Sequence, residues 1–128
     1  MSLAYIIEDN EVMGELFARD LNGITETKVF HDAISAINSI SSDKPDMIFL
    51  DVLLTGPDGF TFLNEIVSYE DTAKIPVVLV TSLDIKAETL ENYNVKKILR
   101  KENMLPEDFK NTAREILEEK VKDGEKSK

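Results

Sequence analysis

The sequence predicts an α/β fold, with one domain built on a doubly wound sheet of five parallel strands. The first observation is that five short apolar, β-rich runs recur along the chain with helical stretches between them. Strands that alternate with helices produce right-handed crossovers and a parallel sheet covered by helices on both faces. The second observation is length, because 128 residues are the size of one ordinary domain and can bury a core.

The predicted strands share apolar and β-branched residues. They are Ala4–Ile7, Thr27–Phe30, Met47–Val52, Val77–Val80 and Lys97–Leu99. The first, third and fourth runs are continuously hydrophobic instead of alternating, which is typical of strands covered on both faces. The second run is weaker.

Apolar residues at helical spacing lie between these strands. They predict helices around residues 12–17, 34–40 and 60–67. A weaker helix is predicted over Asp84–Glu91, where Ile85 with Thr89 or Leu90 forms the only apolar face.

The last helix has the clearest signals. Pro106 suits a first-turn position, and Glu107 and Asp108 follow where the helix dipole favours acids. The end of the chain is small, polar and charged. We therefore expect the domain to span residues 1–122 and residues 123–128 to form a polar tail or the start of a linker.

Composition excludes several classes of function. The chain has no cysteine, which excludes disulfides and thiolate metal sites. A formal net charge of −10 keeps a small protein soluble and repels nucleic acid, so direct DNA or RNA binding is not expected. No apolar run approaches the roughly 18 residues that cross a bilayer. The first residues lack a basic stretch followed by an apolar segment, so we expect no secretory signal. We expect a cytoplasmic protein without a membrane partner.

Chemically useful side chains follow four of the five predicted strands. Glu8 and Asp9 follow the first strand, the third runs straight into Asp51, Thr81 follows the fourth and Lys101 follows the fifth. In doubly wound folds ligands bind beyond the carboxyl ends of the strands. Three carboxylates, a hydroxyl and an ammonium are therefore expected at one edge of the sheet.

Asp51 is the most informative of these residues, because an ionised carboxylate beside a buried strand is unfavourable unless it is paired. Nearby Glu8 and Asp9 add to the negative charge. Mg²⁺, which prefers oxygen ligands, would resolve this conflict, and Lys101 supplies another positive charge. Each residue also has a simpler explanation as a turn, cap or surface residue. Four strand ends with complementary groups favour a site.

Four segments together resemble the response-regulator receiver family of two-component signalling, of the chemotaxis-regulator type. They are Ile6–Asn10 (IIEDN), Phe49–Phe60 (FLDVLLTGPDGF), Pro76–Ser82 (PVVLVTS) and Ile98–Lys101 (ILRK). Gly59 falls eight residues after Asp51, as in the family, and the similarity extends from about Ala4 to Glu119. The resemblance implies a flavodoxin-like (βα)5 fold with strand order 2-1-3-4-5.

The resemblance also implies a function. Asp51 would be a phosphoacceptor that receives a phosphoryl group from a sensor histidine kinase or a histidine phosphotransfer protein. Lys101 would bind the phosphoryl oxygens and Thr81 would move to hydrogen-bond them. Such a domain is a signalling phosphoacceptor that assists its own phosphorylation and dephosphorylation, not an enzyme. It acts on a downstream protein or on a covalently linked output domain, and the sequence leaves open which.

Four residues are implied as ligands of a Mg²⁺ cofactor. Asp9 and Asp51 would hold the ion with their carboxylates, Glu8 would act through a water, and Leu53 would contribute its backbone carbonyl. Phosphoryl transfer depends on this kind of alignment and charge neutralisation more than on covalent chemistry by the protein.

The chain departs from the family pattern near the lysine. Ile98 stands where an aromatic residue is usual, and an aliphatic side chain cannot swing a ring between buried and exposed positions. Glu102 stands where a cis-bonded proline is usual. A cis bond without proline costs about 3–4 kcal/mol, so the sequence predicts a trans Lys101–Glu102 bond.

One further departure and two apolar residues lie in the loops around the implied phosphoacceptor. Thr55 replaces a common proline, which is a mild change. Leu53 and Leu83 lie two residues beyond Asp51 and Thr81. In the family these two positions flank the path of the attacking water. Neither leucine can orient a water, so we expect the phosphoaspartate to hydrolyse slowly.

Two alternatives remain. One is a pseudo-receiver, an interaction module with an atypical or absent phospho-switch, which Ile98 and Glu102 favour. The other is an aspartyl-phosphate hydrolase, but such enzymes commonly need an acid at the position of Leu53. His31, the one histidine, has no evident partner for acid–base work.

Overall fold

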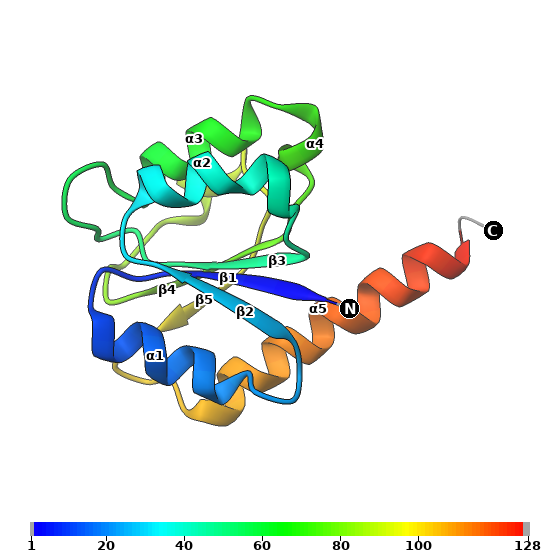
Figure 1. The fold of residues 1–128 in the computed structure, drawn as a ribbon. Helices are drawn as coiled ribbons and strands as arrows, with labels where there is room; N and C mark the ends of the chain where they lie inside the picture. The colour runs from blue at the N-terminus through cyan, green and yellow to red at the C-terminus, as the bar shows by residue number, and fades with distance from the viewer. Residues whose placement is uncertain (1, 127–128) are drawn as a thin grey trace.

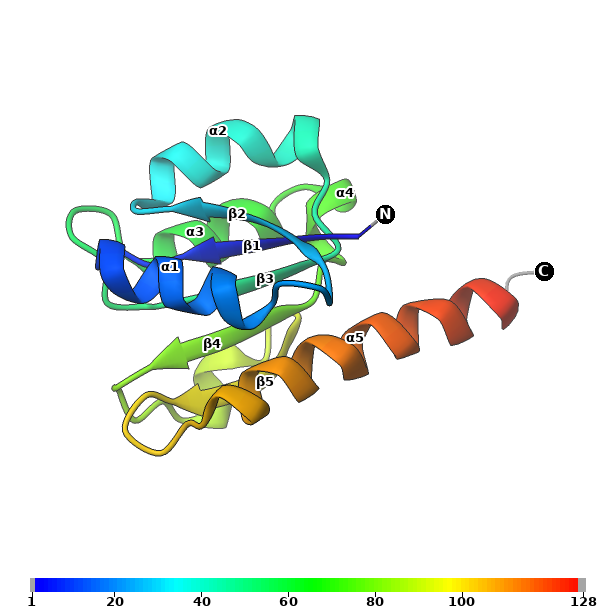
Figure 2. The same cartoon turned by 60° about the horizontal axis from the view of Figure 1, so that its bottom comes forward.

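A computed structural model describes residues 2–126 of the chain. Its strands are β1 (Leu3–Ile7), β2 (Glu26–Phe30), β3 (Met47–Leu50), β4 (Val77–Thr81) and β5 (Val95–Arg100). They form one parallel sheet in the order β2-β1-β3-β4-β5, and Figures 1 and 2 show helices on both of its faces. The predicted fold class and strand order are confirmed.

The burial of the strands follows their place in the sheet. Every residue of β3 and β4 is buried, as are the last four residues of β1, whereas the edge strands β2 and β5 carry exposed residues. The continuous hydrophobic runs therefore mark the three central strands. The predicted end of the third strand at Val52 is wrong, because β3 ends at Leu50 and Asp51 is the first residue beyond it.

Three helices lie where apolar spacing predicts them, namely α1 (Glu11–Asp20), α2 (Ala33–Asp43) and α3 (Gly59–Val67). Each begins after a residue whose side chain accepts a hydrogen bond from the N–H three residues on; these caps are Asn10, Asp32 and Asp58. A short helix α4 (Glu70–Ala73), which the sequence analysis does not predict, follows α3.

The helix predicted over Asp84–Glu91 is wrong. A single 3-10 turn, η1 (Ala87–Leu90), occupies this segment, and Leu90 is its one buried residue. A helix gains most of its stability from a continuous apolar face packed on the core. With one buried anchor per turn, this segment has too little apolar area for several α-helical turns.

Helix α5 (Pro106–Lys126) is the longest of the described helices, and Figure 2 shows its C-terminal part extending past the sheet. It continues through residues 123–126, which the sequence predicts as part of a polar tail. Residues 127–128 of that tail lie outside the described residues. The domain boundary at residue 122 stays a prediction.

Two apolar clusters fix the helices to the sheet. One packs α2 and α3 on one face, and the other packs α1 and α5 on the opposite face. In the second cluster Phe109 stacks on Phe17 at 4.9 Å and on Phe49 at 4.3 Å between ring centroids. Among the described residues, no helix has both the length and the apolar character needed to span a bilayer.

Candidate functional site

Three carboxylates meet beyond the ends of β1 and β3. The register pairs Ile7 with Leu50, so the next residues, Glu8 and Asp51, lie side by side. The Asp51 N–H also donates to the Ile7 carbonyl at 3.0 Å. One carboxylate oxygen from each of Glu8, Asp9 and Asp51 lies within 4.8 Å of the others. The structure thus brings together the acids that the sequence places at this edge.

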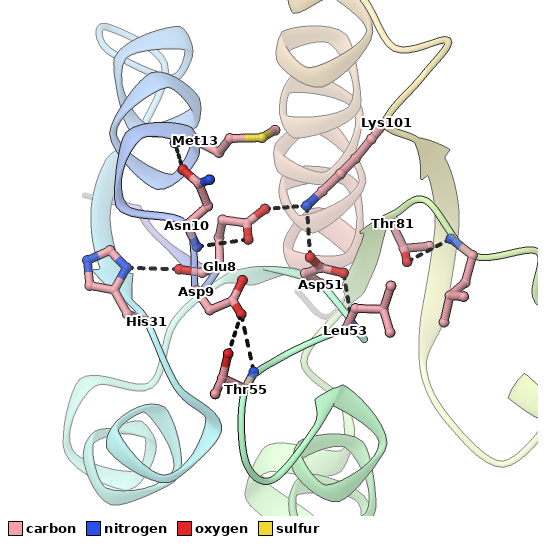
Figure 3. Close-up of polar contacts among 11 residues, drawn as sticks. Glu8, Asp9, Asn10, Met13, His31, Asp51, Leu53, Thr55, Thr81 and Lys101 are labelled. Carbon is pink, nitrogen blue, oxygen red and sulfur yellow. Dashed lines mark hydrogen bonds and ion pairs between the residues drawn. The ribbon is translucent and has the colours of Figure 1, made fainter.

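Lys101 joins two of these acids. Its Nζ donates to Glu8 Oε1 at 2.5 Å and to Asp51 Oδ2 at 2.8 Å, as Figure 3 shows. Its backbone N–H donates to the Thr81 carbonyl at 3.0 Å, which anchors the lysine beyond the end of β5. The ammonium is thereby directed across β4 into the acidic cluster, where both carboxylates are buried.

Burial and pairing act against each other in this cluster. Burial is the main influence on Glu8 and raises its pKa, although the hydrogen bond from Lys101 works in the opposite direction. Burial also disfavours a charged Lys101, but its hydrogen bonds to Asp51 and Glu8 outweigh this and raise its pKa. The charge of Lys101 is therefore favoured in this cluster, and its ammonium offsets only part of the effect that burial has on Glu8.

Asp51 is positioned by its own loop and by the start of α3. The Leu53 N–H donates to Asp51 Oδ1 at 3.0 Å, and the Gly59 N–H donates to the Val52 carbonyl at 3.0 Å. A Cβ on Gly59 would lie 2.5 Å from Val52 Cα and 2.8 Å from the Asp51 carbonyl oxygen. Glycine lets α3 begin this close to the backbone of the loop that follows β3.

Thr81 lies near Asp51 but bonds elsewhere. The register pairs Leu50 with Leu79, which places buried Thr81 one residue beyond the neighbour of Asp51. Its hydroxyl accepts a hydrogen bond from the Leu83 N–H at 3.2 Å (Figure 3). The hydroxyl is therefore turned toward the loop after β4.

Asn10 and the acids before it have different roles. The alternative that this segment simply caps a helix holds for Asn10, whose side chain accepts from the Met13 N–H at 3.0 Å. Glu8 and Asp9 instead turn to the acidic cluster. His31 contacts the same segment, with its Nδ1 2.8 Å from the Glu8 carbonyl oxygen.

The sequence analysis missed the contact of Thr55. Its hydroxyl and its backbone N–H both donate to Asp9 Oδ2, at 2.9 Å and 3.2 Å. Burial alone would raise the pKa of Asp9, but these hydrogen bonds, together with other polar contacts, hold it below its usual range. The sequence did offer a signal for this contact, because threonine in place of a common proline adds a backbone N–H and a hydroxyl as hydrogen-bond donors.

The sequence analysis also missed an ion-pair network around Arg100. The guanidinium contacts Asp84 and Glu102, each at 2.5 Å, and so links the loop after β4 to the loop after β5. No peptide bond within residues 2–126 is cis, so the predicted trans Lys101–Glu102 bond is confirmed. Glu102 thus forms an ion pair with Arg100 at a position where the family usually has a cis-bonded proline.

Comparison with known proteins decides the family. The sequence profile of the family described as "Response regulator receiver domain" matches residues 4–114, most of the chain. The chain belongs to this family. The protein is thus the receiver domain of a two-component response regulator, a signalling domain.

The receiver domain has relatives among longer response regulators. It is 32% identical over 87 residues to response regulator PleD of Caulobacter vibrioides, covering 67% of this chain and 19% of PleD. It is 31% identical over 85 residues to response regulator MprA of Mycobacterium ulcerans, covering 65% of this chain and 35% of MprA. The chain therefore spans about a fifth to a third of these curated relatives.

A solved structure supports the fold. The signal receiver domain of a putative LuxO repressor protein from Vibrio parahaemolyticus matches with a TM-score of 0.84 at 20% identity. The match covers 95% of each chain. At this identity the likeness concerns the fold, and it agrees with the strand order of the receiver domain.

Proposed function

We propose that this receiver domain accepts a phosphoryl group on Asp51, in a Mg²⁺-dependent reaction, from a sensor histidine kinase or a histidine phosphotransfer protein. The observation that carries the proposal is the position of Asp51. Its carboxylate lies just beyond a buried strand, within reach of two other acids, and accepts a hydrogen bond from Lys101.

The chemistry of the donor set fits Mg²⁺. Three carboxylates lie within 4.8 Å of one another, and carboxylate oxygen is the ligand type that this hard cation prefers. Asp9 and Asp51 would bind the ion directly, Glu8 through a water, and Leu53 through its backbone carbonyl. When bound, Mg²⁺ would neutralise negative charge on the acids and on the incoming phosphoryl oxygens.

The chain's own residues carry the transfer. A carboxylate oxygen of Asp51 attacks phosphorus in the donor's phosphohistidine, the new O–P bond forms, the N–P bond breaks, and the imidazole leaves. Lys101 already contacts Asp51, so its ammonium would bind the phosphoryl oxygens without a large displacement. The pairing of Lys101 with Glu8 keeps the ammonium in this place.

Phosphorylation would then change the surface around β4 and β5. The phosphoryl group adds charge and strong acceptors next to Asp51. The Thr81 hydroxyl would leave the Leu83 N–H to bond the phosphoryl group, and its loop would follow. A downstream protein, or a covalently linked output domain, would bind the changed surface. Ile98 would take part by repacking, without a ring movement.

The lifetime of phosphorylated Asp51 would be long. Leu53 and Leu83, whose positions flank the approach to the acid in the family, are both exposed and apolar. They offer an incoming water no hydrogen-bond partner. We expect hydrolysis of the phosphoaspartate to be slow without a phosphatase. Mass spectrometry that follows the decay of the phosphorylated protein over time will measure its rate.

Mass spectrometry after incubation with acetyl phosphate and Mg²⁺ tests the main proposal. We expect the mass of one phosphoryl group to be added to the wild type, but not to Asp51→Asn and not in EDTA. Asp71→Asn, at an exposed position of α4, is the matched control and should react like the wild type. Absence of the gain in the wild type, or its survival in Asp51→Asn, would favour the pseudo-receiver alternative.

A further inference from the structure

The loop between β3 and α3 reaches across the site to hold Asp9. Thr55 lies in this loop, 46 residues from Asp9 in sequence, and donates two hydrogen bonds to it. Both bonds end on the same oxygen, Oδ2, at 2.9 Å from the hydroxyl and 3.2 Å from the backbone N–H. Figure 3 shows the other carboxylate oxygen of Asp9 on the side of Glu8 and Asp51.

This arrangement restricts the rotation of the Asp9 carboxylate from one side. Asp9 is half-buried beyond β1, and Thr55 is exposed, so the two bonds are formed at the rim of the acidic cluster. A proline in place of Thr55 would lack both the N–H and the hydroxyl and could form neither bond. The contact therefore depends on the residue that this chain carries here.

We propose that Thr55 is a positioning residue for the cation site. By holding Oδ2 of Asp9, Thr55 turns the other carboxylate oxygen of Asp9 toward the cation. The inference rests on the Mg²⁺ site of the proposed function. Ligating carboxylates are commonly oriented by hydrogen bonds from outer residues, and loss of such a partner typically lowers metal affinity 10–100-fold. Through the same bonds, occupation of the site is coupled to the loop that carries Leu53.

Titration of the full chain with Mg²⁺ alone tests this inference, by calorimetry and by amide chemical shifts. Thr55→Val keeps the shape of the side chain but removes the hydroxyl donor, so we expect affinity to fall about tenfold. Thr55→Ser restores the donor and should bind nearly as well as the wild type. Thr89→Val, at an exposed position of η1, is the matched control and should match the wild type.

Measuring the free energy of unfolding in EDTA and in Mg²⁺ distinguishes a positioning role of Thr55 from a purely structural one. The free energy of unfolding of Thr55→Val should fall below that of the wild type far more in Mg²⁺ than in EDTA. The reason is that the lost hydrogen bond lowers the affinity for Mg²⁺, and bound Mg²⁺ stabilises the folded state. An equal loss in both buffers, or wild-type affinity for Mg²⁺ in Thr55→Val, would overturn the inference.

The Asp9→Asn variant distinguishes failure of the inference from failure of the proposed function. If Asp9→Asn loses Mg²⁺ binding while Thr55→Val does not, the cation site stands and the role of Thr55 is wrong. If the wild type shows no binding that depends on Asp9, both the site and the role of Thr55 are wrong.

Discussion

The two halves of the receiver site use ion pairs in opposite environments. At the ends of β1 and β3, the side chains of Glu8 and Asp51 are 2% and 6% exposed and share Lys101. At the ends of β4 and β5, Arg100 pairs with Asp84 and Glu102, which are 96% and 48% exposed. Buried charges depend on their partners, whereas exposed pairs are screened by water and contribute little.

The elements that cover each half explain the difference. Helices α1 and α3, each capped by a side chain, lead away from the acidic half. The single 3-10 turn η1 lies between β4 and β5 in the other half. Lys101 follows β5 in sequence but makes its contacts in the acidic half. The structure thus places the buried ion pairs of Lys101 in one half and the exposed ion pairs of Arg100 in the other.

Lys101→Met should have the largest effect on stability, because it leaves two buried carboxylates without their cation. We expect a loss of about 3–5 kcal/mol in the free energy of unfolding in EDTA, and partial recovery in Mg²⁺. Urea unfolding in the two buffers measures this. Lys97→Met, at an exposed position of β5, is the matched control; an equal effect of both substitutions would contradict the comparison.

Gly59→Ala should come next, because its Cβ would meet the backbone of Val52 and Asp51. We expect a loss of roughly 1–3 kcal/mol in the free energy of unfolding. Gly14→Ala is the comparison, since its Cβ would meet the Val29 side chain, which can move. Urea unfolding should show the larger loss for Gly59→Ala, and the reverse order would refute the role given to Gly59.

Glu8→Gln should change the pH dependence of stability in metal-free buffer. Because burial raises the pKa of Glu8 in the folded state, the folded protein binds more protons at Glu8 than the unfolded protein does. Wild-type stability should therefore fall as pH rises from the unfolded-state pKa of Glu8 through its higher folded-state pKa.

Glu8→Gln removes this group, so the variant should be more stable than the wild type at neutral pH and lose its advantage in acid. Unfolding midpoints measured across this pH range in EDTA will show it. Parallel pH profiles for the two proteins would contradict the assignment.

Arg100→Ala should have the smallest effect on stability, because its partners are exposed. The unfolding midpoint should change less than for the three substitutions above, while amide exchange at Leu83 and Asp84 speeds up as the loop loses its link. Salt should produce a similar change in the wild type. A loss as large as that of Lys101→Met would show that the two halves do not differ.

The sequence predicted the core of the fold and the acidic half of the site. Continuous apolar runs marked the central strands, and parallel strands bring their carboxyl ends to one edge. Glu8, Asp51 and Lys101 could therefore be placed together before their contacts were known. Local patterns were insufficient for the segment after β4, where the predicted helix over Asp84–Glu91 is a 3-10 turn.

The tertiary structure decided the contacts between loops. Thr55 meets Asp9, and Arg100 meets Asp84, only because residues far apart in sequence end at the same edge of the sheet. The sequence by itself determined which groups the strand ends carry, because the hydrophobic pattern that marks each strand is a local property of the chain. Which donor faces which acceptor depends on loop geometry, and that follows from packing of the whole domain.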